Sequence, residues 1–287
     1  MIYIGNHLSS SKGFEAMGKA ALKLGANTFA FFTRNPRGGA AKAIDPADVE
    51  KLLELMREQQ FGKLVAHAPY TMNLCAAKPD IREFSWNILK DDMERMEYLP
   101  GNYYNFHPGA HVGQGAEETI PVIADALNHA IKPTQSTVVL LETMAGKGSE
   151  IGKRFEELAA IYDGVRFPDR LRVCFDTCHV HDAGYDLTAN PDLVLDEFDK
   201  TLGKDQIAVF HINDSKNEKG AAKDRHANLG VGQIGFAPLY HIVHHPDFLT
   251  IPKILETPWY PDPQNPKKLL PPYRREIAWL RAGRIDA

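Results

Sequence analysis

Short apolar runs alternate with amphipathic stretches along the whole chain, and this alternation constrains the fold more than any other feature of the sequence. Residues 2–8 predict a strand, residues 11–24 predict a helix that stops at Gly25, and residues 27–34 predict a second strand rich in aromatic side chains. A strand, a helix and a further strand in this order form the unit from which parallel sheets are built.

The same unit recurs until eight strands, each followed by a helix, are accounted for. The further strands are expected at residues 61–70, 102–109, 137–144, 170–177, 206–214 and 251–257, and the further helices at 45–60, 80–98, 117–131, 155–162, after Pro191, 236–244 and 273–280. Eight such units in 287 residues, joined by right-handed crossovers, predict an α/β fold in which a single (β/α)8 TIM barrel spans residues 1–287 as one domain.

Two segments depart from the alternation. Residues 213–235 are rich in Gly, Asn and Lys, and a loop of that length in a compact domain is usually functional or mobile. Residues 258–273 contain so many prolines that they argue against a regular element and predict an ordered crossing over the barrel mouth.

The overall charge and the hydropathy pattern limit the class of protein. The formal charge of -4 argues against a protein that coats nucleic acid non-specifically, although it allows a local basic groove. The chain starts without a basic leader before a long apolar run, and no apolar stretch reaches membrane-spanning length. We therefore expect a cytoplasmic protein that does not contact a membrane.

The three cysteines, Cys75, Cys174 and Cys178, are sparse and odd in number, which suits reduced thiols better than a disulfide framework. A zinc-thiolate site at Cys174 and Cys178 is an alternative. Their spacing within one strand and its exit favours buried thiols instead.

Polar residues with metal-binding groups follow the predicted strands at their C-terminal ends. Seven stand at or just beyond strands three to eight, and two more lie in the 213–235 loop: His67, His107, Glu142, Asp176, His179, His211, Glu256, Asp224 and His226. In a barrel these ends converge on one face, where active sites of this architecture are assembled.

Each of these residues taken alone would be an ordinary structural side chain. Nine ionisable groups in one barrel mouth are costly to bury unless cations neutralise the carboxylates and bind the imidazole nitrogens. A tetrahedral catalytic ion takes three protein ligands, so nine ligands predict two or three ions if a carboxylate bridges. His7 is expected to face the same mouth, whereas His111 and His181 are expected to neighbour the ligands or to lie on the surface.

Several motifs carry a resemblance to a known family. They are YIGNHLS, NFHPGAH, LLETMAGKGSEIG, CFDTCHVHDAGYDL, HINDSK, DRHANLGVGQIG and ILET. With them the chain resembles the endonuclease IV family of apurinic/apyrimidinic endonucleases, which are built on a metal-bearing TIM barrel. The likeness is nearly full-length, and DTCH followed by AGYD, or DRH followed by LGVGQIG, is far more specific than an isolated metal triplet.

The resemblance implies three Zn²⁺ ions, with Mn²⁺ able to occupy some of the sites. The implied ligand sets are His67, His107 and Glu142 for the first ion, Glu142, Asp176, His211 and Glu256 for the second, and His179, Asp224 and His226 for the third. Glu142 would then bridge two ions.

The implied reaction is hydrolysis of the DNA phosphodiester 5′ to an abasic site, in base excision repair, by a monomeric enzyme. Two ions bridged by a carboxylate lower the pKa of a shared water towards neutrality, which yields a hydroxide nucleophile, and they also clamp the phosphate. Glu142 and Glu256 are the candidate catalytic residues, and the sequence leaves open which of them orients or deprotonates that water.

Recognition of double-stranded DNA is implied for the loop after the second strand, which carries Arg37. Family members follow this arginine with bulky residues that enter the duplex, whereas here it is followed by Gly38 and Gly39, which have no side chain for that purpose. Arg34 and Lys42 flank it, and beside a barrel mouth this basic cluster is expected to contact phosphates.

The loop after the third strand supplies Tyr70, which matches the intruding tyrosine of the family, with Thr71 or Met72 in place of its apolar neighbour. A second basic cluster, residues 216–225, ends in Arg225, which is expected to contact DNA.

Two other functions remain open from the sequence. Sugar isomerases and epimerases of the xylose-isomerase-like class share this architecture, although they need only about four ligands and would leave His67, His107, His179 and the DRH motif unused. A barrel that binds metal or DNA without nuclease activity is the second alternative, and Gly38 and Gly39 keep it open.

Overall fold

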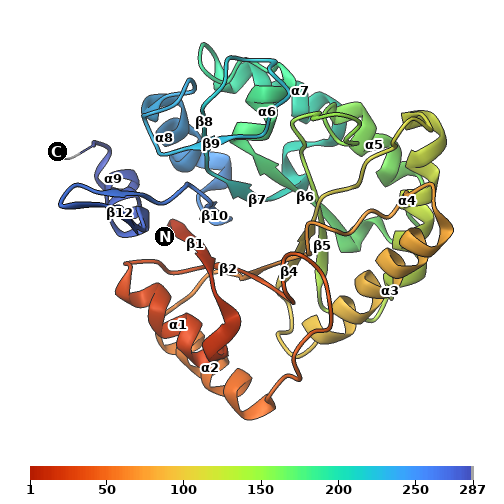
Figure 1. The fold of residues 1–287 in the computed structure, drawn as a ribbon, viewed down its shortest axis with the longest axis horizontal. Coiled ribbons are helices and arrows are strands. Elements are labelled where there is room, and N and C mark those ends of the chain that lie inside the picture. Colours follow the sequence, from red (N-terminus) through yellow and green to blue (C-terminus); the bar gives the residue numbers. More distant parts are fainter. Residues whose placement is uncertain (286–287) are drawn as a thin grey trace.

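Eight parallel strands close into a barrel at the centre of the structure, a computed structural model that describes residues 1–285 (Figure 1). Around the ring the order is β1, β10, β7, β6, β5, β4, β3, β2, so strands that follow one another in the chain lie side by side and β10 closes against β1. The α/β class and the TIM-barrel architecture predicted from the sequence are confirmed.

The elements have the following bounds. The barrel strands are β1 (Tyr3–Leu8), β2 (Ala30–Phe32), β3 (Val65–His67), β4 (Tyr103–Phe106), β5 (Val138–Glu142), β6 (Leu171–Asp176), β7 (Ile207–His211) and β10 (Pro252–Leu255). The α-helices are α1 (Phe14–Lys23), α2 (Pro46–Glu58), α3 (Pro79–Met96), α4 (Ala116–Ala130), α5 (Phe155–Asp163), α6 (Thr177–Ala183), α7 (Pro191–Leu202), α8 (Phe236–His244) and α9 (Tyr273–Ala282). Two small hairpins are formed by β8 (Asp214–Ser215) with β9 (His226–Ala227) and by β11 (Tyr260–Asp262) with β12 (Asn265–Leu270).

The barrel strands alternate between side chains that face the barrel interior and side chains that face the helices. The small interior cluster includes Val65, Leu140, Cys174, Val209 and Ile254. Two positions further along the same strands stand His67, Glu142, Asp176, His211 and Glu256. Because side chains two apart share a face, the apolar interior is capped by these polar groups at the C-terminal mouth.

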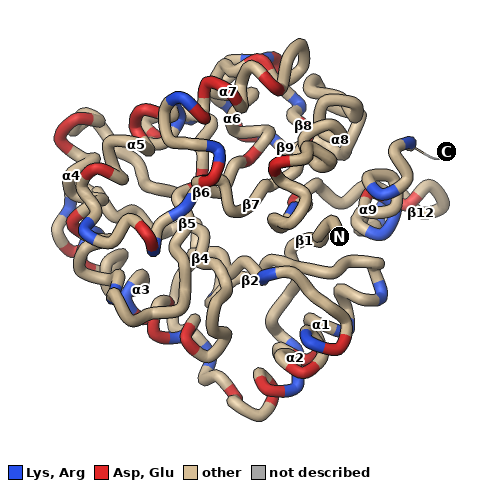
Figure 2. The backbone as a smooth tube through the Cα atoms, turned by 180° about the vertical axis from the view of Figure 1, so that it is seen from behind, with Lys and Arg blue, Asp and Glu red and all other residues tan. Residues whose placement is uncertain are grey.

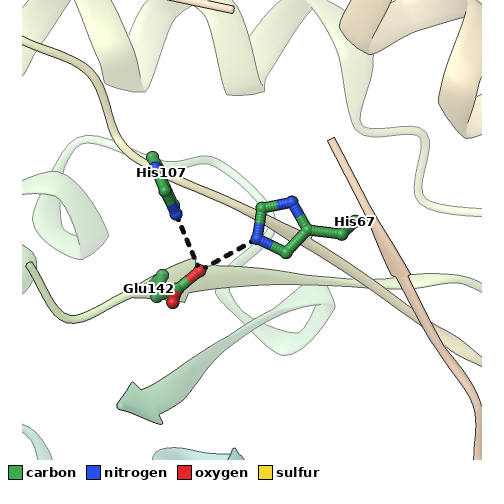
Figure 3. A group of neighbouring side chains, drawn as sticks. All are labelled: His67, His107 and Glu142. Atoms are coloured by element: carbon green, nitrogen blue, oxygen red, sulfur yellow. Dashed lines mark hydrogen bonds and ion pairs between the residues drawn. The ribbon is translucent and has the colours of Figure 1, made fainter. Parts of the chain in front are cut away.

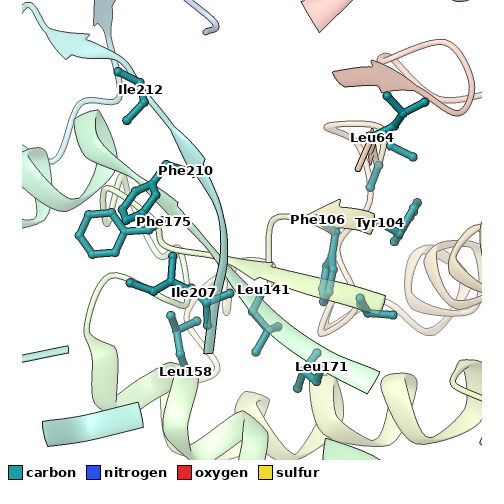
Figure 4. Packing of buried hydrophobic residues seen from close by; sticks show 14 of the residues in the cluster. Leu64, Tyr104, Phe106, Leu141, Leu158, Leu171, Phe175, Ile207, Phe210 and Ile212 are labelled. Atoms are coloured by element: carbon teal, nitrogen blue, oxygen red, sulfur yellow. The ribbon is translucent and has the colours of Figure 1, made fainter. Parts of the chain in front are cut away.

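The outward faces of the strands pack against the helices. Phe175 of β6 and Phe210 of β7 (Figure 4) are fully buried with ring centroids 5.3 Å apart, and Phe175 also contacts Phe155 of α5 and Phe198 of α7. Burial of each side chain of this size contributes about 2–3 kcal/mol to stability. The mouth therefore rests on a rigid platform.

Polar caps define where several helices begin. Asp45 accepts a hydrogen bond from the Ala47 amide at α2, and Asn190 accepts one from Leu193 at α7. Asp176 ends β6 and at the same time caps α6, which the sequence did not predict because seven residues are too few to show a helical period.

The prediction that residues 258–273 contain no regular element is wrong, because β11 and β12 form a hairpin within this segment. A two-stranded ribbon has only edge strands, and an edge strand tolerates prolines because the missing amide hydrogens would face solvent. The hairpin projects at the side of the barrel next to α9 (Figure 1).

Charged residues of both signs are interspersed along the outer helices (Figure 2), as expected for a net charge near zero. Within residues 1–285 no helix is both long enough and apolar enough to cross a membrane.

Candidate metal centre

The structure brings all nine predicted ligands together at the C-terminal mouth. Three groups contain only predicted ligands, and within each the ligand atoms lie within 4.8 Å of one another: His67, His107 and Glu142; Glu142, Asp176, His211 and Glu256; and Asp176, His179 and His226. A fourth group, within the same distance, joins Cys174 to Glu142 and His211. Asp224, the ninth residue, adjoins the third group.

The first group is centred on Glu142 of β5 (Figure 3). Its Oε2 atom lies 3.2 Å from Nε2 of His67 and 3.3 Å from Nε2 of His107. The two imidazoles come from the ends of β3 and β4 and converge on one carboxylate oxygen. This is the sequence-predicted set for the first ion.

The second group uses the other oxygen of Glu142. Nδ1 of His211 lies 3.1 Å from Oε1 of Glu142, 3.1 Å from Oε2 of Glu256 and 3.7 Å from Oδ2 of Asp176. Glu142 therefore faces both groups with different oxygens, which is the arrangement a bridging carboxylate requires.

The third group combines the junction of β6 and α6 with the segment that leads into β9. Nε2 of His179 lies 3.1 Å from Oδ1 of Asp224, and Nε2 of His226 lies 3.5 Å from the same oxygen. Nε2 of His226 also lies 3.8 Å from Oδ2 of Asp176. Asp176 thus stands between the second and third groups, whereas His179 belongs to the third.

The hydrogen bonds of His67 indicate that its Nε2 atom is a metal-ligand atom. Its Nδ1 lies 2.7 Å from the carbonyl oxygen of Ala68, which can only accept, so Nδ1 carries the proton. Burial lowers the pKa of His67, so the ring is neutral and Nε2 presents a lone pair to the Glu142 carboxylate. Two acceptors face each other across 3.2 Å. A metal ion placed between them satisfies both.

His179 and His226 each direct a ring nitrogen towards the third group. Nδ1 of His179 lies 2.8 Å from the carbonyl oxygen of Thr143, which turns Nε2 towards Asp224 as a ligand atom. Nε2 of His226 is buried without a hydrogen-bond partner. An imidazole whose second nitrogen donates to a backbone carbonyl is typical of metal-binding histidines, so the residues present fit transition-metal ions.

Electrostatics within the cluster couple the acids to the imidazoles. Burial alone would raise the pKa of Glu142, but His211 and His107 outweigh it and hold the pKa well below the usual range. Burial alone would lower the pKa of His179, but Asp176 and Asp224 raise it well above the usual value. The imidazoles therefore lower the pKa of the carboxyl group, and the carboxylates raise the pKa of the imidazole.

Amide side chains around the ligands were missed by the sequence reasoning. Asn105 donates to Oε2 of Glu142 at 2.6 Å, and Asn213 donates to Oδ2 of Asp176 at 2.8 Å while accepting from the Glu256 amide. Both are fully buried. Their positions could have identified them, because each is a polar residue two places from a ligand histidine.

His7 behaves as predicted, since its Nε2 lies 3.0 Å from Oε1 of Glu256. All three cysteines are buried and free, and burial raises the pKa of Cys174 to about 12. Cys174 lies near Glu142 and His211. A thiol that stays protonated packs as an apolar side chain, which supports the buried-thiol interpretation.

The predicted DNA contacts lie around the mouth with different exposure. Tyr70 is 59% exposed, and its ring centroid lies 5.7 Å from that of His67 and 5.8 Å from that of His107. Arg37 and Arg225 are exposed. Tyr70 is therefore a large accessible ring directly over the first ligand group.

The structure changes the roles expected for Arg34 and Met72. The Arg34 guanidinium is 6% exposed and contacts Asp91 and Asp92, so it anchors its loop to α3 and does not face a phosphate. Met72 is 5% exposed and packs in the core, which leaves Thr71 as the accessible neighbour of Tyr70. The neighbouring acids on α3 were too distant in the sequence to suggest the pairing.

Comparison with known proteins places this mouth in a family. A family model described as a xylose isomerase-like TIM barrel matches residues 19–283. A probable endonuclease 4 of Alkaliphilus oremlandii (strain OhILAs) is 55% identical over 258 residues, which cover 90% of this chain and 92% of the relative. The chain belongs to the endonuclease IV family. The crystal structure of endonuclease IV from Thermus thermophilus matches with a TM-score of 0.83 and 34% identity, covering 98% of both chains.

Family membership makes the protein an enzyme of the endonuclease IV type and confirms the resemblance drawn from the motifs. A D-tagatose 3-epimerase-like protein also matches, with a TM-score of 0.66, 17% identity and coverage of 88% of this chain and 90% of that one. At that identity it shares the fold alone.

Proposed function

We propose that this protein hydrolyses the phosphodiester on the 5′ side of an abasic site in double-stranded DNA, leaving a 3′-hydroxyl and a 5′-deoxyribose phosphate, as a step of base excision repair. The observation that carries the proposal is the convergence of nine ligand residues in three groups that share Glu142 and Asp176. The family name of the relatives, endonuclease, supports the same class of reaction.

Three Zn²⁺ ions are proposed as the cofactors, with Mn²⁺ possible in some sites. His67, His107 and Glu142 would hold the first, Glu142, Asp176, His211 and Glu256 the second, and His179, Asp224 and His226 the third. When bound, such ions lower the pKa of water and neutralise phosphate charge.

The protein's own groups prepare the centre for that chemistry. Asn105 and Asn213 hold the Glu142 and Asp176 carboxylates in fixed orientations through hydrogen bonds of 2.6 and 2.8 Å. Backbone carbonyls of Ala68 and Thr143 hold His67 and His179 in a single tautomer. The site needs little rearrangement, which is the condition for strong electrostatic stabilisation of a transition state.

Glu256 is the better placed of the two candidate carboxylates to handle the attacking water. Its side chain is 14% exposed, whereas that of Glu142 is 1% exposed and contacted by four imidazoles. His7 holds the second oxygen of Glu256. We assign proton transfer to Glu256 and the bridging role to Glu142.

Tyr70 is proposed to pack against the flipped abasic sugar or to fill its place in the duplex, since it is exposed above His67 and His107. Arg37 and Arg225 would contact phosphates on either side. Gly38 has φ +89°, and a Cβ atom at this position would lie 2.7 Å from Oγ1 of Thr71, so a larger residue here would displace the neighbour of Tyr70.

Sugar epimerase activity is the second candidate function, and only the shared fold supports it. It would leave the first and third ligand groups without a role, although these account for His67, His107, His179 and His226. The monomeric state and the cytoplasmic location expected from the sequence belong to the proposal as well.

A 5′-labelled duplex with one tetrahydrofuran abasic analogue tests the activity, with the undamaged duplex as control. The zinc-loaded protein should nick only the damaged strand, immediately 5′ to the analogue, and leave an end that a polymerase extends. Intact DNA with all ions in place would instead favour the epimerase or a binding protein, and turnover of a ketohexose in a parallel reaction would identify the former.

A further inference from the structure

The loop that carries Asp224 is held by the C-terminal end of α6, and Asp182 is the main anchor. This carboxylate is fully buried. Its Oδ1 accepts from the Ser215 hydroxyl at 2.6 Å, and its Oδ2 accepts from the Asn217 side-chain amide at 3.0 Å and from the backbone amide of Asp224 at 2.9 Å. One side chain thereby joins both ends of the segment 215–224.

Backbone contacts from the same turn of α6 reinforce this attachment. The carbonyl oxygen of His181 accepts from the Gly220 amide at 3.0 Å, and that of Asp182 accepts from the Ala222 amide at 2.9 Å. Nε2 of His181 lies 3.1 Å from the carbonyl oxygen of Asn217. His181, expected near the ligands or on the surface, is therefore buried against this loop.

The backbone of Asp224 needs such support. Its φ is +54°, a left-handed conformation that a residue with a side chain adopts at a cost, and Ala222 two residues earlier has φ +50°. A residue in this conformation persists only where its surroundings determine it. The hydrogen bond from the Asp224 amide to Asp182 stabilises this left-handed conformation directly.

The consequence is geometric. Asp182 holds the backbone amide of Asp224. In this position, Oδ1 of Asp224 lies 3.1 Å from Nε2 of His179 and 3.5 Å from Nε2 of His226. Without the hydrogen bond from the Asp224 amide to Asp182, the loop is no longer attached to α6 at the ligand residue. The Asp224 carboxylate can then move away from the two imidazoles. His179 itself is fixed independently by Thr143 and by the α6 cap.

We infer that Asp182 is a positioning residue for the third metal ion, acting through the backbone of Asp224 and touching no ion itself. This inference rests on the proposed function, since it requires a third ion held by His179, Asp224 and His226. The ions of the first two groups depend on strand ends that Asp182 does not contact, so the effect is selective for one ion of three.

The test compares D182A and D182N with the wild type after removal of metal and stepwise loading with Zn²⁺ or Co²⁺. Metal content is measured by mass spectrometry, and Co²⁺ is followed by its visible absorption. D182A should bind the third equivalent about 10–100-fold more weakly, the usual effect of losing an outer hydrogen-bond partner. D182N should restore binding, because its carbonyl can accept from Asp224 while its amide donates to the Ser215 hydroxyl.

D186N is the matched control, since Asp186 pairs with Lys219 of the same loop at 2.5 Å on the surface. It should keep three ions at wild-type affinity. If D182A does not fold, D182S takes its place, because a serine at this position is too short to reach the Asp224 amide.

Three ions bound by D182A with wild-type affinity would overturn the inference, even if its metal-free form melts at a lower temperature, because the role would then be structural only. A wild-type protein that binds no third ion would overturn the proposed function and the inference together. Selective loss of one ion in D182A, with rescue in D182N, supports both.

Discussion

Nε2 of His67 lies 3.2 Å from Oε2 of Glu142, and in the neutral ring neither atom carries a hydrogen. Two acceptor atoms this close together need a positive charge between them. A proton or a metal ion must occupy the space between the two atoms, and burial lowers the pKa of His67, which disfavours the proton. Metal content is therefore the property from which the other expectations follow.

Elemental analysis should find close to three transition-metal ions per chain. Prolonged dialysis against a chelator should abolish cleavage and lower the unfolding temperature, because each ion bound only by the folded protein adds about 2.7 kcal/mol at a free concentration 100 times its Kd. Readdition of Zn²⁺ should restore both. A single ion per chain, with full activity, would contradict the three-ion centre.

Replacement of Glu142 by Gln should lower kcat/KM for the abasic duplex by at least about 100-fold, which corresponds to about 2.7 kcal/mol of lost transition-state stabilisation. The amide keeps the shape of the side chain but removes the negative charge that two ligand groups share. E117Q, at an exposed carboxylate in the first turn of α4, serves as control and should be unchanged. Retained turnover in E142Q would mean that the bridging role is misassigned.

Removal of the Tyr70 ring should weaken binding of the abasic duplex by roughly 1–3 kcal/mol, the range for loss of an aromatic contact to nucleic acid. Y70A should raise KM more than it lowers kcat, since the tyrosine belongs to none of the three ligand groups. Y98A provides the comparison, because Tyr98 is 49% exposed but follows α3 at the other end of the barrel. Equal KM values for Y70A and the wild type would exclude the DNA role.

Lys253 gives the stability a defined pH dependence. It is buried on β10, where it donates to the Phe248 carbonyl, and burial lowers its pKa to about 7. Between pH 7 and the unfolded value of 10.5, the unfolded chain binds more protons than the folded one, so the destabilisation caused by this amine shrinks as pH rises.

The difference in unfolding free energy between K253M and the wild type should therefore move in favour of the wild type by up to a few kcal/mol as pH rises through this window, at about 1.4 kcal/mol per pKa unit. Urea titrations at pH 7 and pH 10 measure it. Parallel stability curves for the two proteins would show that Lys253 titrates normally in the fold.

The barrel and its ligands were predictable because both follow from strand periodicity. A polar residue two places beyond an interior apolar residue, as Glu142 is beyond Leu140, must face the mouth once the strands close. The position of Asp224 was not predictable in this way. It depends on a left-handed backbone and on a hydrogen bond to Asp182, neither of which has a periodic signature.

Contacts between distant charged residues escaped prediction for a similar reason. Arg34 looked like a phosphate ligand because its own loop, residues 33–44, contains no acidic residue. Its partners Asp91 and Asp92 lie on a helix far along the chain. The hairpin at residues 260–270 was missed because prolines usually break regular elements, although an edge strand accommodates them.

The ligands of the mouth come from the ends of β3, β4, β5, β6, β7 and β10, which span most of the chain. Ions bound there would tie strand ends together around the circumference of the barrel, and because only the folded chain brings these ligands together, unfolding would have to release the ions. Because its three cysteines are buried and free, the protein would rely on metal–ligand bonds for the reinforcement that disulfides give other proteins. Its resistance to heat would then be set by the supply of metal.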